Sequence, residues 1–196
     1  LAGRVAYVDL GPIQALEWAP NNLDTLWLRG GFPESLLAAN DPSSLRWRED
    51  FVRSYLQRDV PMFAPRLPAE TVGRLWTMLA HQQGAFLQQS RLASALGVSS
   101  PTLDRYIDLL VDLQLVRRLR PWRGNTGKRL VKAPKVYLRD SGLVHALLGL
   151  ENLNDLAGHP VCGMSYEGFC IDNLLAAAGS MVTPYTYRTH AGAEID

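Results

Sequence analysis

The stretch SRLASALGVSSPTLDRYIDLLVDLQLVRRLR, residues 90–120, decides how the fold is interpreted. Ser90 and Ser99 each precede a run of apolar residues at helical spacing, and serine is a favoured residue at a helix N-cap. Gly97 lies between the two runs, where glycine can adopt the left-handed conformation that ends a helix. The order of helix, glycine turn and helix therefore predicts a helix-turn-helix.

A basic hairpin is predicted directly after these helices. Two β-favouring segments, 115–120 and 135–138, are joined through the turn-forming run Gly124-Asn125-Thr126-Gly127. A hairpin in this position makes the unit a winged helix, with the hairpin as its wing. We call residues 117–139 the basic segment, because it holds nine cations and no acid while the rest of the chain has a net charge of −8. The nine are Arg117, Arg118, Arg120, Arg123, Lys128, Arg129, Lys132, Lys135 and Arg139.

A cationic wing indicates nucleic acid, because it can displace the counterions condensed on phosphates. The amides and the dipole at the start of the second helix also favour anions. We therefore expect DNA as the partner, bound without catalysis by residues of this helix start and of the basic segment: Ser100, Thr102, Arg105, Arg117, Arg118, Arg123, Lys128, Arg129 and Lys132.

The second helix itself argues against base-specific reading of DNA. A helical wheel assigns Leu103, Tyr106, Ile107, Leu110 and Leu113 to its buried face. The water-facing side then carries Asp104, Asp108 and Asp112, which would repel phosphates. This acidic face supports a rival function, a protein-interaction module whose wing docks on its own body or on a partner subunit. A third interpretation is a solvated hairpin that keeps an edge strand from aggregating.

Composition narrows the class of protein. The chain has 196 residues, of which 47% are hydrophobic and 20% charged, as in ordinary globular proteins. Its longest apolar stretch, residues 142–150, is about half of the roughly 20 residues of a membrane-spanning helix. Two cysteines cannot build a disulfide framework. We therefore expect a cytoplasmic protein with no membrane partner. Composition does not decide whether it forms an oligomer.

The flanking regions have fewer signals. Asp41-Pro42 predicts a helix start, and that helix is expected to run to about Asp59 and to stop before Pro61. Pro61, Pro65 and Pro68 then form a stiff connector. Strands are expected at residues 4–10 and 181–188. The chain begins at Leu1 and stops within an expected strand, so we interpret it as a fragment of a longer protein.

Candidate catalytic groups are sparse. Residues 124–129 fail as a phosphate loop, because that motif needs glycine in place of Trp122 and a hydroxyl in place of Arg129. The histidines and cysteines have no metal-ligand spacing. Glu167 on an expected helix and Asp196 at the end of the next hairpin are two acids that can meet around a hard divalent cation. We expect no cofactor in this fragment and no complete active site.

Several motifs together resemble a known family. The chain is similar to the domain-of-unknown-function family 4143 (DUF 4143) in these motifs. They are Gly30-Gly31-Phe32-Pro33, residues 55–60, Lys128-Arg129-Leu130 with residues 134–137, Asp140-Ser141-Gly142-Leu143 and Glu194-Ile195-Asp196. The likeness extends over nearly the whole chain. In that family the domain follows an AAA-type ATPase module in bacterial and archaeal proteins.

The resemblance implies a longer parent protein. An ATPase module that binds ATP and magnesium would precede Leu1, so the parent would be an ATPase. Glu167 and Asp196 match two acids of a PD-(D/E)xK nuclease-like motif, whose remaining acid and lysine would follow Asp196. The fragment alone cannot assemble that site. A fragment of a metal-dependent nuclease is therefore a further alternative function.

The expected architecture is mostly α, of the α+β class. Residues 1–17 are taken as the exit from the missing ATPase module, and residues 18–68 as a helical linker subdomain. Residues 69–150 form the winged helix-turn-helix. Residues 151–196 begin an incomplete α/β module that resembles a restriction endonuclease.

Overall fold

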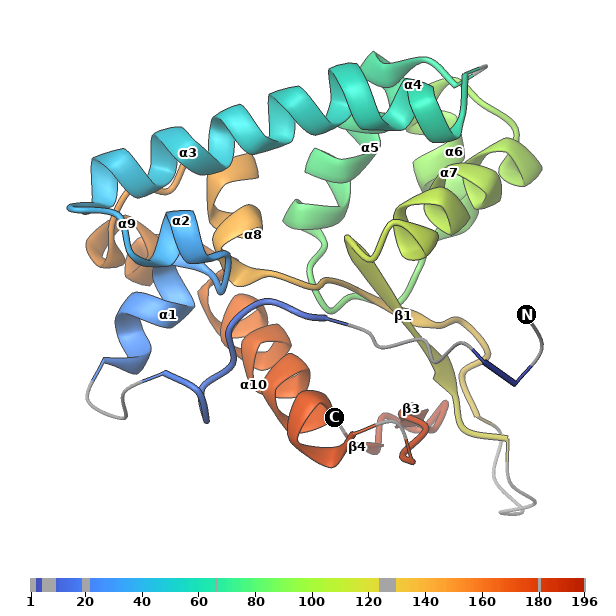
Figure 1. The fold of residues 1–196 in the computed structure, drawn as a ribbon. Coiled ribbons are helices and arrows are strands. Elements are labelled where there is room, and N and C mark those ends of the chain that lie inside the picture. The colour runs from blue at the N-terminus through green and yellow to red at the C-terminus, as the bar shows by residue number, and fades with distance from the viewer. Residues whose placement is uncertain are drawn as a thin grey trace.

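The computed structural model describes residues 3–4, 10–18, 22–65, 67–123, 130–179 and 181–195. It is an α+β fold in which the helices lie above and to one side of a small sheet (Figure 1). None of the described helices combines the length and apolar character needed to cross a bilayer. The elements are α1 (Leu23–Arg29), α2 (Pro33–Leu36), α3 (Asp41–Ser54), the π-helical turn η1 (Tyr55–Asp59), α4 (Val60–Phe63), α5 (Ala69–His81), α6 (Gln89–Leu96), α7 (Ser100–Asp112), β1 (Val116–Pro121), β2 (Lys135–Leu138), α8 (Ser141–Leu147), α9 (Leu153–Gly158), α10 (Cys162–Ala178), β3 (Tyr185–Arg188) and β4 (Glu194–Ile195).

The described strands form one sheet in the order β2-β1-β3-β4. β1 pairs antiparallel with β2, with Arg118 opposite Val136, and parallel with β3, with Arg120 opposite Tyr185. β4 pairs antiparallel with β3. The strand predicted at 181–188 is therefore shorter than expected, and residues 5–9 of the strand predicted at 4–10 lie outside the described residues.

The helix pair at the centre of the sequence prediction is confirmed. Gly97 ends α6 with a φ of 68°, in the left-handed region that glycine tolerates. The Ser99 side chain accepts a hydrogen bond from the Thr102 amide and caps α7. The buried residues of α7 are four of the five that the wheel predicts, and Leu113 is half-buried. At α6 the cap is Gln88 rather than Ser90, and it makes no side-chain cap hydrogen bond.

The helix that begins at Asp41 continues past its predicted end. Its N-cap is Asn40, whose side chain accepts from the Ser43 amide, one residue before the predicted cap. Pro61 does not stop the helix, because the turn before it widens to a π-helix in which the Val60 amide donates to the Tyr55 carbonyl. A proline lacks the amide hydrogen of an α-helical turn, and the wider turn accommodates this loss.

One core connects most of the chain. Its buried residues include Leu28, Val72, Leu143 and Leu156, so residues from three of the four predicted domains share it. The domain boundaries themselves stay predictions. His145 is also buried, where Nδ1 lies 2.9 Å from the Leu28 carbonyl oxygen and Nε2 lies 2.7 Å from the Ser165 hydroxyl. This histidine therefore serves packing.

The crossing of α1 and α8 depends on small residues. Gly30 has a φ of 76°, and a Cβ there would lie 2.1 Å from an Asp140 carboxylate oxygen. The Asp140 side chain accepts from the amides of Gly31 and Leu143, so it joins the end of α1 to the start of α8. A Cβ on Gly142 would lie 2.2 Å from the Arg29 carbonyl oxygen. Both glycines are thus required by close packing, Gly30 against the Asp140 side chain and Gly142 against the backbone at the end of α1.

This contact predicts the effect of a single methyl group. Gly142→Ala should lower the free energy of unfolding by about 1–3 kcal/mol or more, because the added carbon meets backbone rather than a movable side chain. Gly163→Ala is the matched control in α10, where a Cβ would have no neighbour within 4 Å. The control should stabilise by up to about 1 kcal/mol, since alanine favours helix. Urea denaturation of both variants measures the difference, and equal stabilities would contradict the tight crossing.

Candidate nucleic-acid interface

Strand β1 directs consecutive arginines to opposite faces of the sheet. Side chains alternate along a strand, so Arg117 and Arg118 point apart. Arg117 binds Asp172 of α10, and Arg118 binds Asp108 of α7. One face of the sheet therefore turns toward α10 and the other toward α7. These contacts divide the basic segment into cations that bind the protein's own acids and cations that do not.

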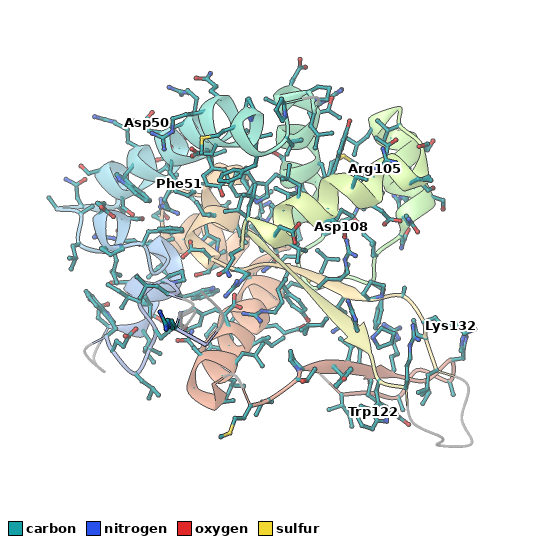
Figure 2. The ribbon with its side chains drawn as sticks, turned by 45° about the vertical axis from the view of Figure 1, so that its right-hand side comes forward. Asp50, Phe51, Arg105, Asp108, Trp122 and Lys132 are labelled. Atoms are coloured by element: carbon teal, nitrogen blue, oxygen red, sulfur yellow. The ribbon has the colours of Figure 1, made fainter. Side chains whose placement is uncertain are left out.

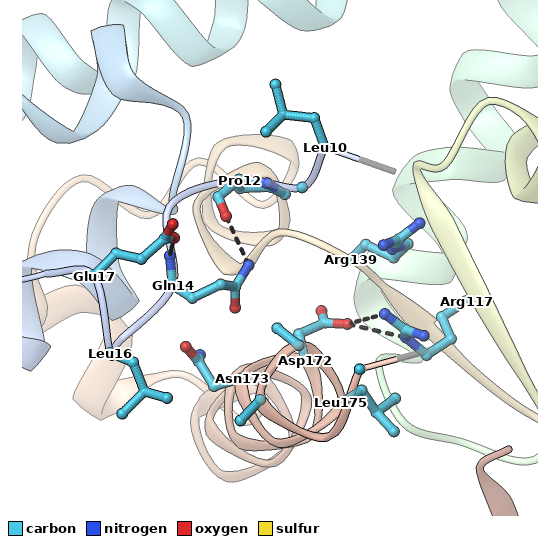
Figure 3. Close-up of a pocket in the computed structure, with 14 residues that line it drawn as sticks. Leu10, Pro12, Gln14, Leu16, Glu17, Arg117, Arg139, Asp172, Asn173 and Leu175 are labelled. Carbon is cyan, nitrogen blue, oxygen red and sulfur yellow. Dashed lines mark hydrogen bonds and ion pairs between the residues drawn. The ribbon is translucent and has the colours of Figure 1, made fainter. Parts of the chain in front are cut away.

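The Arg117–Asp172 pair is half-buried beside an open pocket (Figure 3). Arg117 Nε and Nη2 lie 3.0 and 2.9 Å from the same Asp172 oxygen. Burial raises the pKa of Asp172 to about 6, and the positive charge of Arg117 opposes this rise. The pocket, of about 740 Å³, lies between residues 10–17 and the second half of α10. Its polar and apolar side chains follow no pattern that indicates a ligand.

Lys135 is the most buried cation of the basic segment among the described residues. Its ammonium lies 3.3 Å from a Glu167 oxygen on α10 and 2.8 Å from a Glu194 oxygen on β4. Arg188 binds the other Glu194 oxygen at 3.1 Å, and the Tyr137 hydroxyl bonds to Glu167. Burial and this carboxylate together raise the pKa of Tyr137. Lys135 therefore joins β2 to α10 and β4, and its charge is used inside the protein.

Three other cations of the basic segment lie near the outer end of the hairpin. Arg120, Arg123 and Lys132 are exposed, and no ion pair joins them to an acid among the described residues. Figure 2 shows Lys132 at this end, beyond the helices. Lys128 and Arg129, which the sequence also assigns to DNA binding, lie outside the described residues. The Arg139 side chain donates to the Gln114 side chain.

An aromatic pair accompanies these cations. The rings of Trp122 and Tyr185 meet edge to face, with centroids 5.3 Å apart, and each side chain is 46% exposed. Trp122 lies in Figure 2 at the same end of the hairpin as Lys132. Cations and exposed rings thus share one surface, which we call the outer surface: Arg120, Trp122, Arg123, Lys132 and Tyr185.

The start of α7 presents part of the predicted DNA-binding set. Ser100 and Thr102 are half-buried in the first turn, and Arg105 is exposed one turn later. On the same helix Asp104 bonds to Gln89, whereas Asp108 holds Arg118. Of these two acids, only Asp108 is neutralised by a cation among the described residues, because the partner of Asp104 is a neutral amide.

The fold brings no further metal ligands to the site predicted at Glu167 and Asp196, among the residues that the structure describes. Glu167 already contacts Lys135 and Tyr137, and Asp196 lies outside the described residues. Among the described residues no group of three or more histidine, cysteine or acidic side chains could hold a metal ion. The nuclease alternative therefore stays a prediction.

Comparison with known proteins decides the family. The family described as "Domain of unknown function (DUF8612)" matches residues 20–154. The chain belongs to this family. Two uncharacterized proteins, of Mycobacterium bovis and Mycobacterium tuberculosis, are each 41% identical to the chain over 199 residues. The match covers all of this chain but 44% of each relative, so the chain spans less than half of their length. No solved structure matches the chain significantly.

The predicted membership in DUF 4143 is wrong, because the matching family is DUF8612. The AAA-type ATPase module predicted before Leu1 loses its support, as do the ATP and magnesium of a parent ATPase, since the relatives are uncharacterized proteins. The physical reason lies in the motifs that carried the resemblance. Gly30 and Gly142 allow two helices to cross closely, and a packing requirement of this kind does not by itself identify a family.

Sequence reasoning missed three sets of contacts made by the wing and its neighbouring strands. It did not pair Arg117 with Asp172, because 55 residues separate them. It also missed Glu194 as the partner of Lys135 and Arg188, and the contact between Trp122 and Tyr185. The run Arg120-Pro121-Trp122-Arg123 carried a usable signal, since an aromatic residue between cations is typical of nucleic-acid surfaces.

The raised pKa of Asp172 predicts a pH-dependent stability. Between about pH 4 and 6 the folded protein keeps a proton on Asp172 that the unfolded chain has released, so stability from this group falls as pH rises. Asp172→Asn cannot ionise. Relative to wild type, its free energy of unfolding should rise by about 2–3 kcal/mol from pH 4 to 7. Urea unfolding across this range measures the difference.

The control is Asp50→Asn, which removes an exposed carboxylate on α3 (Figure 2). Its stability relative to wild type should show no comparable rise. The difference between variant and wild type also cancels the opposite contribution of His145, whose pKa burial lowers to about 4. A flat difference curve for Asp172→Asn would mean that Arg117 outweighs the cost of burying this carboxylate.

Proposed function

We propose that this DUF8612 chain is a non-catalytic module that contacts DNA through the outer surface of a wing. In this interpretation α5, α6 and α7 form the helical part of a winged helix, and β1 with β2 forms its wing. Helices α1–α4 act as a linker subdomain, and the region from α9 to β4 begins the α/β module expected at residues 151–196, which is joined to the wing through the β1–β3 pairing.

The observation that carries the proposal is the distribution of cations. Arg120 and Arg123 are exposed close to Trp122 in the chain, and the exposed Lys132 lies at the same end of the hairpin as Trp122 (Figure 2). No acid among the described residues pairs with them, so their charges are available to phosphates. Each cation that contacts a phosphate releases condensed counterions, which favours binding to any sequence of DNA.

The internal ion pairs contribute indirectly. Arg117 and Arg118 hold β1 against α10 and α7 from opposite faces. Lys135 holds β2 against α10 and β4. DNA binding by these three residues would first require separation from their partners. This separation is most costly for Arg117 and Lys135, whose charges are the more shielded from water. We therefore assign them to positioning the wing and keep the outer cations for phosphate contact.

The first turn of α7 supports a second contact. Its amides and helix dipole favour an anion near Ser100 and Thr102, and Arg105 is exposed on the same helix. Asp112 is exposed further along α7. Phosphate contact at the helix start, rather than base reading along the helix, fits this distribution.

A protein-interaction module is the second candidate. Three cations of the basic segment, Arg117, Arg118 and Lys135, bind acids of the same chain. A wing that docks on its own body in this way can equally dock on an acidic partner subunit. This function predicts a defined oligomer or complex and no affinity for DNA. Size-exclusion chromatography with light scattering separates it from the first candidate.

Salt dependence tests the DNA-binding proposal. Binding of a fluorescent duplex, followed by anisotropy, should weaken with salt at a log–log slope of about −3 to −4, as expected for about four phosphate contacts. The variant Arg120→Gln/Arg123→Gln/Lys132→Gln should bind all sequences more weakly, and its slope should be shallower by about 3. The separate variant Arg123→Gln/Lys128→Gln/Arg129→Gln tests the two wing cations whose placement is not described.

The matched control is Arg46→Gln/Arg53→Gln/Arg74→Gln. It removes the same charge from exposed positions on α3 and α5. The control should keep the slope of the wild type if contact is confined to the wing. A flat salt dependence in the wild type, or an equal loss in both triple variants, would refute DNA contact through the outer surface.

A further inference from the structure

The proposed function assigns no role to the pair of Trp122 and Tyr185, although the two rings are in direct contact. The two rings lie at 83° to each other with centroids 5.3 Å apart, and both side chains are 46% exposed. A pair that served only the core would be buried, as Tyr137 and Trp76 are. Half of each large ring instead faces outward at the end of the sheet.

The sheet fixes both residues from their backbones. Arg120 is opposite Tyr185 in the parallel β1–β3 register, so both side chains project from the same face. Trp122 is two residues after Arg120 and projects from that face as well. Its amide donates to the Thr186 carbonyl at 2.7 Å, which holds the segment after β1 against β3. The rings are therefore presented by paired backbone rather than by a free loop.

Three exposed cations lie in the same part of the wing as this pair. Arg120 lies on the same face, Arg123 follows Trp122 in the chain, and Lys132 lies at the same end of the hairpin. In an edge-to-face pair, one ring covers a face of the other with its edge, and the remaining ring faces are not used within the pair. Exposed ring faces among cations match the requirements of an unpaired nucleotide, whose base stacks while its phosphate is neutralised.

We propose that Trp122 and Tyr185 stack on unpaired bases, so that single-stranded nucleic acid is the preferred ligand of the wing. This inference rests on the proposed function, because it uses the same outer surface, and it names the class of nucleic acid. Bases inside a duplex are stacked on each other and offer no face to these rings. Single strands gain both stacking and phosphate contact, whereas a duplex gains phosphate contact alone.

The experiment compares two labelled probes of equal length, an oligothymidine and a mixed-sequence duplex, by fluorescence anisotropy at several salt concentrations. Trp122→Ala and Tyr185→Ala should each weaken binding of oligothymidine about tenfold or more. Binding of the duplex should change less than about twofold, since phosphate contacts remain. Neither variant should change the salt slope, because no charge is lost.

Two controls separate stacking from folding. Phe63→Ala removes an aromatic side chain that is 59% exposed on α4, at the far side of the molecule from β3 in Figure 1. It should leave both affinities unchanged. Trp122→Phe keeps an aromatic face and should restore most of the affinity that Trp122→Ala loses. Equal thermal unfolding of the variants and the wild type excludes a general loss of structure.

The outcomes distinguish this inference from the proposed function. If the outer cations are needed for both probes but Trp122→Ala weakens neither, stacking is wrong and DNA contact stands. If the wild type binds neither probe, the proposed function fails. A change of oligomeric state in Trp122→Ala, without loss of oligothymidine binding, would make the pair a protein interface and overturn the inference. Oligouridine in place of oligothymidine tests whether RNA is bound equally.

Discussion

The fold of the sheet depends on two consecutive arginines in β1 that bind acids on opposite sides. Arg117 reaches Asp172 on α10, and Arg118 reaches Asp108 on α7. Because alternation along the strand forces the two side chains apart, β1 can satisfy both only if it lies between these helices. Loss of one partner would leave a charge with little access to water at the Arg117 site, which is strongly unfavourable. The two pairs therefore help to hold β1 between α10 and α7, and the less exposed Arg117–Asp172 pair contributes more.

Local features of the fold could be predicted from the sequence. The turn at Gly97 and the cap at Ser99 depend on residues within a few positions, and both are present as predicted. The continuation of α3 through Pro61 could not be predicted, because a π-helical turn depends on packing around the whole helix. Ion pairs between distant residues cannot be predicted from local sequence either. Lys135 finds Glu167 and Glu194 only after β2, α10 and β4 have assembled.

Charge counting along the sequence overestimates what a surface can offer. The basic segment contains nine cations and no acid, so the sequence predicts one continuous polycation. In the fold, three of its members are matched with acids that lie outside the segment, on α7, α10 and β4. Motif resemblance has a related weakness. Gly30 and Gly142 mark a tight helix crossing, and a requirement of packing does not identify a family.

If the wing binds DNA as proposed, the described residues supply three outer cations, and the aromatic pair would add to what these charges provide. Electrostatic affinity that arises from counterion release falls steeply with salt, so a surface with few phosphate contacts binds weakly at physiological ionic strength. Stacking on Trp122 and Tyr185 adds free energy that does not depend on released counterions, about 1–3 kcal/mol for each base. Under the proposed function, a wing whose inner arginines are committed to the fold gains affinity when the exposed charges of its described residues act together with contacts to bases. An unpaired strand presents its bases to exposed rings, whereas a duplex does not.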